Sequence, residues 1–237
     1  MRVNFLKKKQ YLCGVLLMLL LPLSGCATNQ KPAADASASA SASEEMQQAD
    51  LSHSAILGNS YVDGFVTYNV LPDTDCFYRI GLNVRTAFTK PMLNRDIPVI
   101  EELNNGKTYD RIFLIFGENE LGWPNTKAFC DGYGDVIDTV RTYQPDAVIY
   151  IQSILPVSAE VSAANIDNTN NEQIIKFNDM LKTIAKDKDA VYLDVASIMT
   201  DADGNLPEDA ATDGIHPGSK YYNKWADYLK THAILEK

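Results

Sequence analysis

Residues 111–116 of this chain read RIFLIF, and residues 117–120, which follow directly, read GENE. The first segment is a continuous apolar run of the kind found in strands that are buried on both faces of a sheet. Residues 147–151 read AVIYI and form an equally strong run. Strands buried on both faces are typical of parallel sheets, so these two segments predict a sheet that is packed between helices.

Other segments extend this alternation along the chain. Further strands are predicted at residues 54–58, 76–80 and 190–194. Between the later strands, apolar residues recur at the spacing of a helix that buries one face. The three stripes are Phe129, Tyr133, Val136, Ile137 and Val140; Ile174, Phe177, Leu181 and Ile184; and Tyr222, Trp225, Ala226, Leu229 and Ala233. The pattern predicts an α/β fold, a flavodoxin-like three-layer sandwich with a five-stranded, mostly parallel sheet.

The first 25 residues have the pattern of an export signal. Three lysines at 7–9 precede an apolar stretch at 11–23, which is shorter than the ~20 residues that a relaxed bilayer span needs. Residues 23–26 read LSGC and resemble the lipobox of bacterial lipoproteins, where the peptide is cut before a lipidated cysteine. The resemblance implies a signal peptide over 1–25 and a lipid on Cys26 that anchors the protein to the outer face of a bacterial membrane. An uncleaved signal anchor is the alternative.

The segment after Cys26 is expected to be a tether. Residues 36–43 read ASASASAS, and the stretch has almost nothing apolar to bury, so 26–50 should be the lipidated cysteine with a disordered linker. The folded domain is then 51–237. Two cysteines lie within it, Cys76 and Cys130, and two buried thiols are favoured over a disulfide bridge because a domain of this size can bury enough core without one.

Composition narrows the possible partners. Hydrophobic residues make up 46% of the chain and charged residues 22%, which excludes a fully disordered protein. All 31 acidic residues follow residue 26, together with 17 basic residues, so this part of the chain has a net charge of −14. The field of such a domain repels nucleic acid and anionic membrane surfaces, so neither is expected to bind it.

Four polar segments follow predicted strands or precede the last helix. They are residues 58–60 (GNS), 80–82 (IGL), 117–120 (GENE) and 213–216 (DGIH). In an open parallel sheet, ligands bind outside the carboxyl ends of the strands. These segments, far apart in the sequence, are therefore expected to meet at one rim of the sheet.

Together the four segments supply the groups that ester hydrolysis requires. Ser60 offers a hydroxyl nucleophile, His216 a base that titrates near neutrality, and Asp213 a carboxylate that can orient the imidazole. The developing oxyanion needs hydrogen-bond donors. The backbone N–H groups of Ser60 and Gly81 and the side-chain amide of Asn119 can provide them.

These segments resemble the blocks of the SGNH hydrolase superfamily, also called GDSL esterases and lipases. Block one is residues 56–64 with Ser60 as the family nucleophile; Gly81, Asn119, and Asp213 with His216 match the later blocks in order. The resemblance implies the flavodoxin-like fold, a Ser-His-Asp triad, an oxyanion hole, no metal and no organic cofactor. Two departures are visible: Asn59 replaces the usual acid of Gly-Asp-Ser, and the usual Asn-Asp ends here in a glutamate.

Each assignment also has a purely structural alternative. Ser60 and Asn119 could cap helices, Asp213 could cap a turn, and Gly81 could be only a turn glycine. Acids next to the blocks are expected to be solvated or to brace turns. Two other histidines compete with His216, but one lies in the predicted loop before the first strand and the other near the end of the last predicted helix. These acids are Glu118, Glu120 and Asp63, and these histidines are His53 and His232.

The expected function is that of a cell-surface, lipid-anchored serine esterase acting on small carboxylic esters. A tethered domain outside the cell meets acetylated polysaccharides, so an O-acetyl group on carbohydrate is the favoured substrate. No long hydrophobic lid is evident, which disfavours long-chain lipids. Two alternatives remain open on the sequence: a non-catalytic surface binding lipoprotein with the same fold, and an O-acyltransferase.

Overall fold

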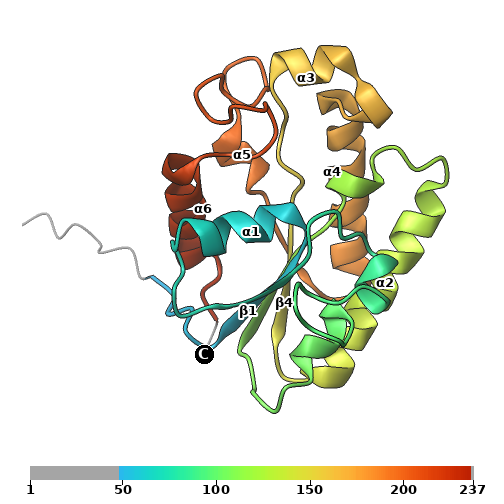
Figure 1. Cartoon of the computed structure of the whole chain (residues 1–237), viewed down its shortest axis with the longest axis vertical. Helices are drawn as coiled ribbons and strands as arrows, with labels where there is room; N and C mark the ends of the chain where they lie inside the picture. The colour runs from blue at the N-terminus through green and yellow to red at the C-terminus, as the bar shows by residue number, and fades with distance from the viewer. Residues whose placement is uncertain (1–47, 236–237) are drawn as a thin grey trace, which may run out of the picture. The chain divides into compact units, whose positions relative to one another are not determined.

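A computed structural model describes residues 48–235 and confirms the predicted architecture (Figure 1). Five strands form one parallel sheet in the order β2-β1-β3-β4-β5 within this range. The strands are β1 (Ser54–Gly58), β2 (Asp75–Tyr78), β3 (Arg111–Ile115), β4 (Val148–Gln152) and β5 (Val191–Leu193). Because every neighbouring pair is parallel, the carboxyl ends of all five strands lie at the same edge, where the polar segments were expected to meet.

Helices cover both faces of the sheet, as Figure 1 shows. Helices α2 and α4 pack on one face, and α1, α5 and α6 pack on the other. The helices are α1 (Ser60–Thr67), α2 (Thr126–Tyr143), α3 (Ala159–Ala164), α4 (Asn171–Asp187), α5 (Ala196–Met199) and α6 (Ser219–His232). Short 3-10 turns add η1 (Thr86–Phe88), η2 (Val99–Leu103), η3 (Glu118–Glu120) and η4 (Ile166–Asn168).

The apolar run at 111–116 is continuous because β3 lies at the centre of the sheet. Successive side chains of a strand point to opposite faces. Ile112 and Leu114 pack into the core under α2 and α4, while Phe113 and Ile115 pack into the core under α1 and α6. Every residue of the three predicted helical stripes is buried in one of these two cores.

The second strand ends two residues earlier than predicted. β2 stops at Tyr78, and the chain then turns sharply, with the Leu82 N–H donating to the Arg79 carbonyl over 3.0 Å. Gly81 adopts a φ of +73°, a region that favours glycine and is incompatible with a continuing strand. Ile80, predicted to lie in the strand, is instead 69% exposed in this turn.

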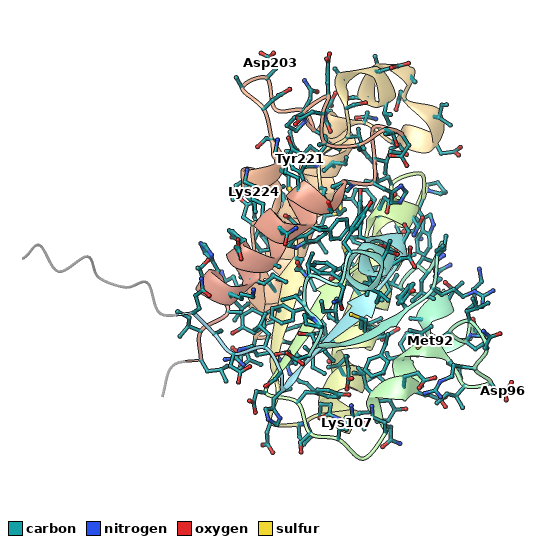
Figure 2. The ribbon with its side chains drawn as sticks, turned by 60° about the vertical axis from the view of Figure 1, so that its left-hand side comes forward. Met92, Asp96, Lys107, Asp203, Tyr221 and Lys224 are labelled. Atoms are coloured by element: carbon teal, nitrogen blue, oxygen red, sulfur yellow. The ribbon has the colours of Figure 1, made fainter. Side chains whose placement is uncertain are left out.

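A long connection between β2 and β3 leaves the sheet beyond this turn. Figure 2 shows Met92 and Asp96 on its projecting part. The Arg95 guanidinium donates two hydrogen bonds, of 3.0 and 2.8 Å, to the carboxylate of Glu102, which is buried. A bidentate contact of this kind restrains both side chains and so fixes the course of the loop.

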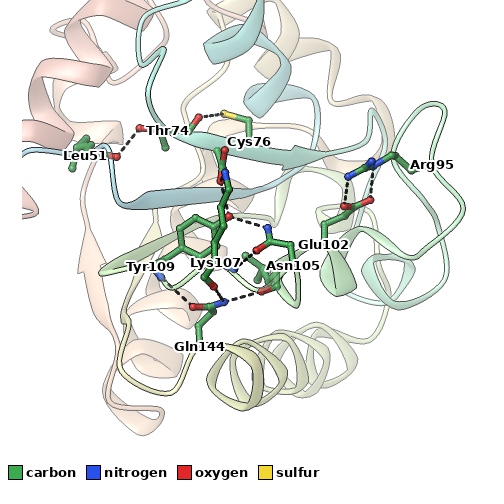
Figure 3. A network of polar contacts seen from close by, with 11 residues as sticks. Leu51, Thr74, Cys76, Arg95, Glu102, Asn105, Lys107, Tyr109 and Gln144 are labelled. Atoms are coloured by element: carbon green, nitrogen blue, oxygen red, sulfur yellow. Dashed lines mark hydrogen bonds and ion pairs between the residues drawn. The ribbon is translucent and has the colours of Figure 1, made fainter.

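The return of this connection into β3 is held by a second set of polar contacts (Figure 3). The buried Gln144 at the end of α2 accepts from the Tyr109 N–H and donates to the Lys107 carbonyl, over 3.1 and 2.9 Å. The Tyr109 hydroxyl and the Lys107 ammonium both donate to Asp75 over 2.6 Å. The connection is therefore tied to both α2 and β2.

The predicted signal peptide over 1–25, the lipidated Cys26 and nearly all of the predicted tether lie outside the described residues. Cys76 and Cys130 are free thiols, each partly buried, so the structure contains no bridge between them. Burial raises the pKa of the Cys76 thiol to about 12. None of the helices between residues 48 and 235 is both long and apolar enough to cross a membrane.

Candidate active site

Ser60 stands where the chain passes from β1 into α1. The residue before it, Asn59, caps the helix, since its side-chain oxygen accepts the Tyr61 N–H over 3.1 Å. Ser60 is therefore the first residue of the helix and not its cap. Its hydroxyl is free for another contact.

That contact joins Ser60 to a residue 156 positions later. Ser60 Oγ lies 2.9 Å from His216 Nε2, and His216 Nδ1 lies 2.7 Å from Asp213 Oδ2. With the proton on Nδ1, where the Asp213 carboxylate accepts it, Nε2 is left to accept the Ser60 hydroxyl. The structure thus brings the three predicted triad residues into one chain of hydrogen bonds with the order that nucleophilic catalysis requires.

Asp213 serves both as a turn cap and as the partner of the imidazole. Its Oδ1 accepts the backbone N–H groups of Ile215 and His216, over 2.9 and 2.8 Å, while Oδ2 holds the imidazole. Partial burial raises the pKa of the carboxyl, but the hydrogen bonds from His216 and these two N–H groups outweigh it, and the pKa lies below its usual value. Asp213 therefore makes the contacts of a turn cap and also contacts the imidazole.

Gly214 is required for this turn. It adopts a φ of +74°, and a Cβ added there would lie 2.4 Å from Ser158 Oγ. Its carbonyl accepts the Ser158 N–H over 2.8 Å at the start of α3. This hydrogen bond holds the loop that carries His216 against α3, and the turn has no space for a side chain at position 214.

The three donors predicted to form the oxyanion hole keep at least one proton free. In the part of the chain that the structure describes, the N–H groups of Ser60 and Gly81 donate to no protein acceptor. Asn119 lies within η3 and is not a helix cap; its Nδ2 donates to the Leu82 carbonyl over 2.8 Å and has a second proton to give. This contact places Asn119 against the turn that contains Gly81, as an oxyanion hole would need.

Glu120 braces the two loops that carry these donors. It is fully buried, with one carboxylate oxygen accepting the Val84 N–H over 2.8 Å and the other the Gly117 N–H over 3.1 Å. Of the two alternatives that the sequence left for Glu120, a solvated side chain is wrong and the bracing role is confirmed. Burial, opposed by these hydrogen bonds and reinforced by Glu118, raises the pKa of Glu120 to about 7.

This raised pKa predicts a particular pH dependence of stability. A folded-state pKa of about 7, against an ordinary ~4.3 when unfolded, means that folding disfavours the ionised carboxyl. Its contribution to the free energy of unfolding is greatest below the unfolded pKa and falls by about 4 kcal/mol as pH rises through the folded pKa. Urea unfolding at pH 4–8 should show a steeper decline in the wild type than in Glu120→Gln, which keeps only the contribution of Glu118. Exposed Glu208→Gln is the control, and parallel curves for wild type and Glu120→Gln would contradict the assignment.

Glu118 was expected to be solvated or to brace a turn, and the expectation of a solvated side chain is wrong. Its side chain is 14% exposed, and Oε1 lies 4.0 Å from His216 Nε2. Burial raises the pKa of Glu118, with His216 lowering it and Asp213 adding to the rise. Burial of this acid depends on a loop nearly a hundred residues later, a contact that has no signal in the local sequence.

Ser60 and His216 open into a hollow of about 270 Å³. Its other walls are Asp63, Gly64, Thr67, Tyr68, Ile80, Pro217 and Tyr222. A second hollow, of about 310 Å³, adjoins it through the shared residues Asp63 and Ile80. Tyr78, Arg79, Met92 and Leu93 complete that lining. Of the nine residues that line the first hollow, the sequence identified only Ser60 and His216 as site residues.

Comparison with known proteins agrees with this architecture. The chain belongs to the GDSL-like lipase/acylhydrolase family, whose model matches residues 56–224. Among curated proteins, none matches the sequence.

Solved structures with the same fold include the following three. One, from Streptococcus pneumonia and described as a candidate platelet activating factor, has 22% identity and a TM-score of 0.62, with 77% of this chain and 84% of that chain covered. A GDSL-like lipase from Bacteroides thetaiotaomicron has 12% identity and a TM-score of 0.56, covering 78% and 89%. A peptidoglycan O-acetylesterase has 19% identity and a TM-score of 0.51, covering 66% of this chain and 44% of that one. At these identities the likeness establishes the fold.

Proposed function

We propose that this acylhydrolase is a serine esterase that removes small acyl groups, above all O-acetyl groups from carbohydrate, at the cell surface. The observation that carries the proposal is the chain of hydrogen bonds from Ser60 through His216 to Asp213. A hydroxyl on a neutral imidazole, which a carboxylate orients in turn, is the arrangement that activates a serine for attack on a carbonyl.

The geometry supports a two-step reaction. Ser60 Oγ attacks the ester carbonyl carbon while its proton moves to His216 Nε2, and the carbonyl oxygen becomes an oxyanion facing Asn119 and the N–H groups of Ser60 and Gly81. The bond to the alcohol then breaks, and Nε2 returns the proton to the departing oxygen. Water, giving its proton to the same nitrogen, attacks the acyl-enzyme, and Ser60 regains its proton as the carboxylic acid leaves. Asp213 stabilises the imidazolium in both steps.

The walls of the site favour a short acyl group and a sugar. The hollow beside Ser60 combines the exposed ring of Tyr68 with the Asp63 carboxylate, a mixture of flat apolar and polar surface that suits a sugar ring. A likeness in fold to a peptidoglycan O-acetylesterase points the same way. The net charge of −14 after residue 26 disfavours polyanionic substrates.

An ester panel tests this choice of substrate. Acetyl esters should be cleaved with a kcat/KM at least about tenfold above that of twelve-carbon acyl esters, because the hollow beside Ser60 is small. An acetylated oligosaccharide should release acetate, measured directly. Preference for the twelve-carbon ester would contradict the proposal, and transfer of acetyl to an added sugar in place of release would identify an acyltransferase.

The proposed location rests on the sequence. The lipobox-like residues 23–26 support a lipid anchor on Cys26, and the low-complexity Ala/Ser stretch after them supports a linker between that anchor and the domain. Mass spectrometry of the protein purified from a bacterial envelope tests this part. A mature chain that begins with acylated Cys26 supports the anchor, and an unmodified residue 26 contradicts it.

A further inference from the structure

Two carboxylates flank the imidazole of His216. Asp213 Oδ2 lies 2.7 Å from Nδ1, and Glu118 Oε1 lies 4.0 Å from Nε2. The two acids differ in environment, because the Asp213 side chain is 51% exposed and that of Glu118 is 14% exposed. The triad accounts for the first carboxylate and leaves the second without a role.

The distances define how Glu118 can act. A separation of 4.0 Å is too long for a hydrogen bond, and Ser60 Oγ already lies 2.9 Å from the same nitrogen. Glu118 therefore does not compete for the Ser60 hydroxyl. It acts on the ring as a nearby charge, and because it is largely buried, water screens that charge weakly.

Asn59 is an uncharged neighbour of the Glu118 carboxylate and donates a hydrogen bond to it. Its side chain is fully buried, with Oδ1 capping α1 at Tyr61 and Nδ2 donating to Glu118 Oε2 over 3.5 Å. An aspartate at 59 could still cap the helix, but it would place a second buried carboxylate against Glu118 and remove the donor. Like charges at such a distance in a buried site repel strongly.

We propose that Glu118 is a positioning residue that stabilises the imidazolium of His216 as the Ser60 proton reaches Nε2, and that Asn59 is the neutral partner that permits a carboxylate there. The proposal rests on the esterase function proposed above. The Gly-Asp-Ser block usually carries an acid at the position of Asn59. This chain has an amide there and an acid at 118 facing it across the nucleophile turn.

The other groups around Glu118 do not supply a competing cation. Asp213 and Glu120 are acids and cannot become positive. Burial, and to a smaller extent nearby acids, raises the pKa of Tyr61 and of Tyr222, so both phenols stay neutral in the working range. Among the titratable groups that the structure places around Glu118, His216 is the one that can become positive. The pKa of Glu118 is raised by its burial, and its ionised form gains its favourable interaction from that ring.

The isosteric variant Glu118→Gln tests the role of the charge. The rate at which a fluorophosphonate labels Ser60, followed from pH 4 to 9, measures proton transfer to His216 without any choice of substrate. A neighbouring carboxylate favours the charged ring, so in Glu118→Gln the acid limb of the profile should move to lower pH by about one unit, and the plateau should fall about tenfold. A loss of rate with an unchanged midpoint would show a merely structural role and overturn the proposal.

Moving the carboxylate from position 118 to position 59 tests the pairing of Glu118 with Asn59. Asn59→Asp should lower the melting temperature and slow labelling, and Asn59→Asp with Glu118→Gln should recover both to nearly the level of Glu118→Gln alone, because one carboxylate again faces one amide. Asn125→Asp, at the cap of α2 with its side chain accepting the Ala128 N–H, controls for the change of cap. Additive effects of the two substitutions would overturn the pairing.

The two proposals fail in different ways. If the parent protein is labelled but neither the pH profile nor the double variant behaves as expected, only the role of Glu118 is wrong. If the folded parent protein is not labelled at all, there is no activated serine, and both the esterase function and the role of Glu118 are overturned.

Discussion

Alanine at position 60 should abolish ester hydrolysis while leaving the fold intact. The Ser60 hydroxyl has one partner among the described residues, His216 Nε2, so its removal takes away the nucleophile without unpairing a buried group. Loss of a serine nucleophile from such a triad lowers kcat by on the order of 10⁶. Initial rates on p-nitrophenyl acetate, with the melting temperature as a check on folding, measure the effect.

A matched serine gives the control for this experiment. Ser197 is exposed on α5, and its hydroxyl donates to the Asp194 carbonyl, away from the triad. Ser197→Ala should retain the activity of the parent. Hydrolysis by Ser60→Ala at the parental rate would show that Ser60 is not the nucleophile, and the proposed function would fall with it.

Asn119→Ala should also lose most of its turnover, through loss of a donor to the oxyanion and not of the nucleophile. The substitution removes one donor to the oxyanion, which forms only in the transition state, so the loss should fall on kcat, with KM nearly unchanged. Removal of one such donor costs about 10²–10³ in rate. Steady-state kinetics on an acetyl ester separate the two constants.

The control must disturb the same loop without removing a donor. Asn119 also holds the Leu82 carbonyl, so part of its effect could come from a loosened turn. Asn83 lies next to this turn, and its side chain caps the N–H groups of Arg85 and Thr86. Asn83→Ala should stay within a few-fold of the parent. Equal losses in the two variants would assign the effect to the loop rather than to the oxyanion.

The general position of the site followed from the sequence because parallel strands share one carboxyl edge. Once the strands at 54–58 and 111–116 are recognised, the residues that follow them have to meet. The match of residues 213–216 to the last SGNH block distinguished His216 from His53 and His232, and the structure places His216 against Ser60. The order of strands, by contrast, had no signal in the local pattern.

The acids next to the blocks show where prediction from sequence ended. Glu118 and Glu120 lie in the same four-residue segment, and nothing in it distinguishes their environments. Glu120 is buried, and its carboxylate accepts two backbone N–H groups, one of which is that of Val84 in another loop. Glu118 is buried against His216, from the far end of the chain. Burial of an ionisable group depends on which distant segments cover it.

The sequence alone determined the layers of the fold, the edge where the site lies and the residues able to carry out acyl transfer, because periodicity and residue chemistry are local properties. Only the tertiary structure decided which of the acids became buried and what lines the hollow beside Ser60. Those features arise where loops from several strands pack together, and the free energy of such packing depends on contacts between residues far apart in the chain.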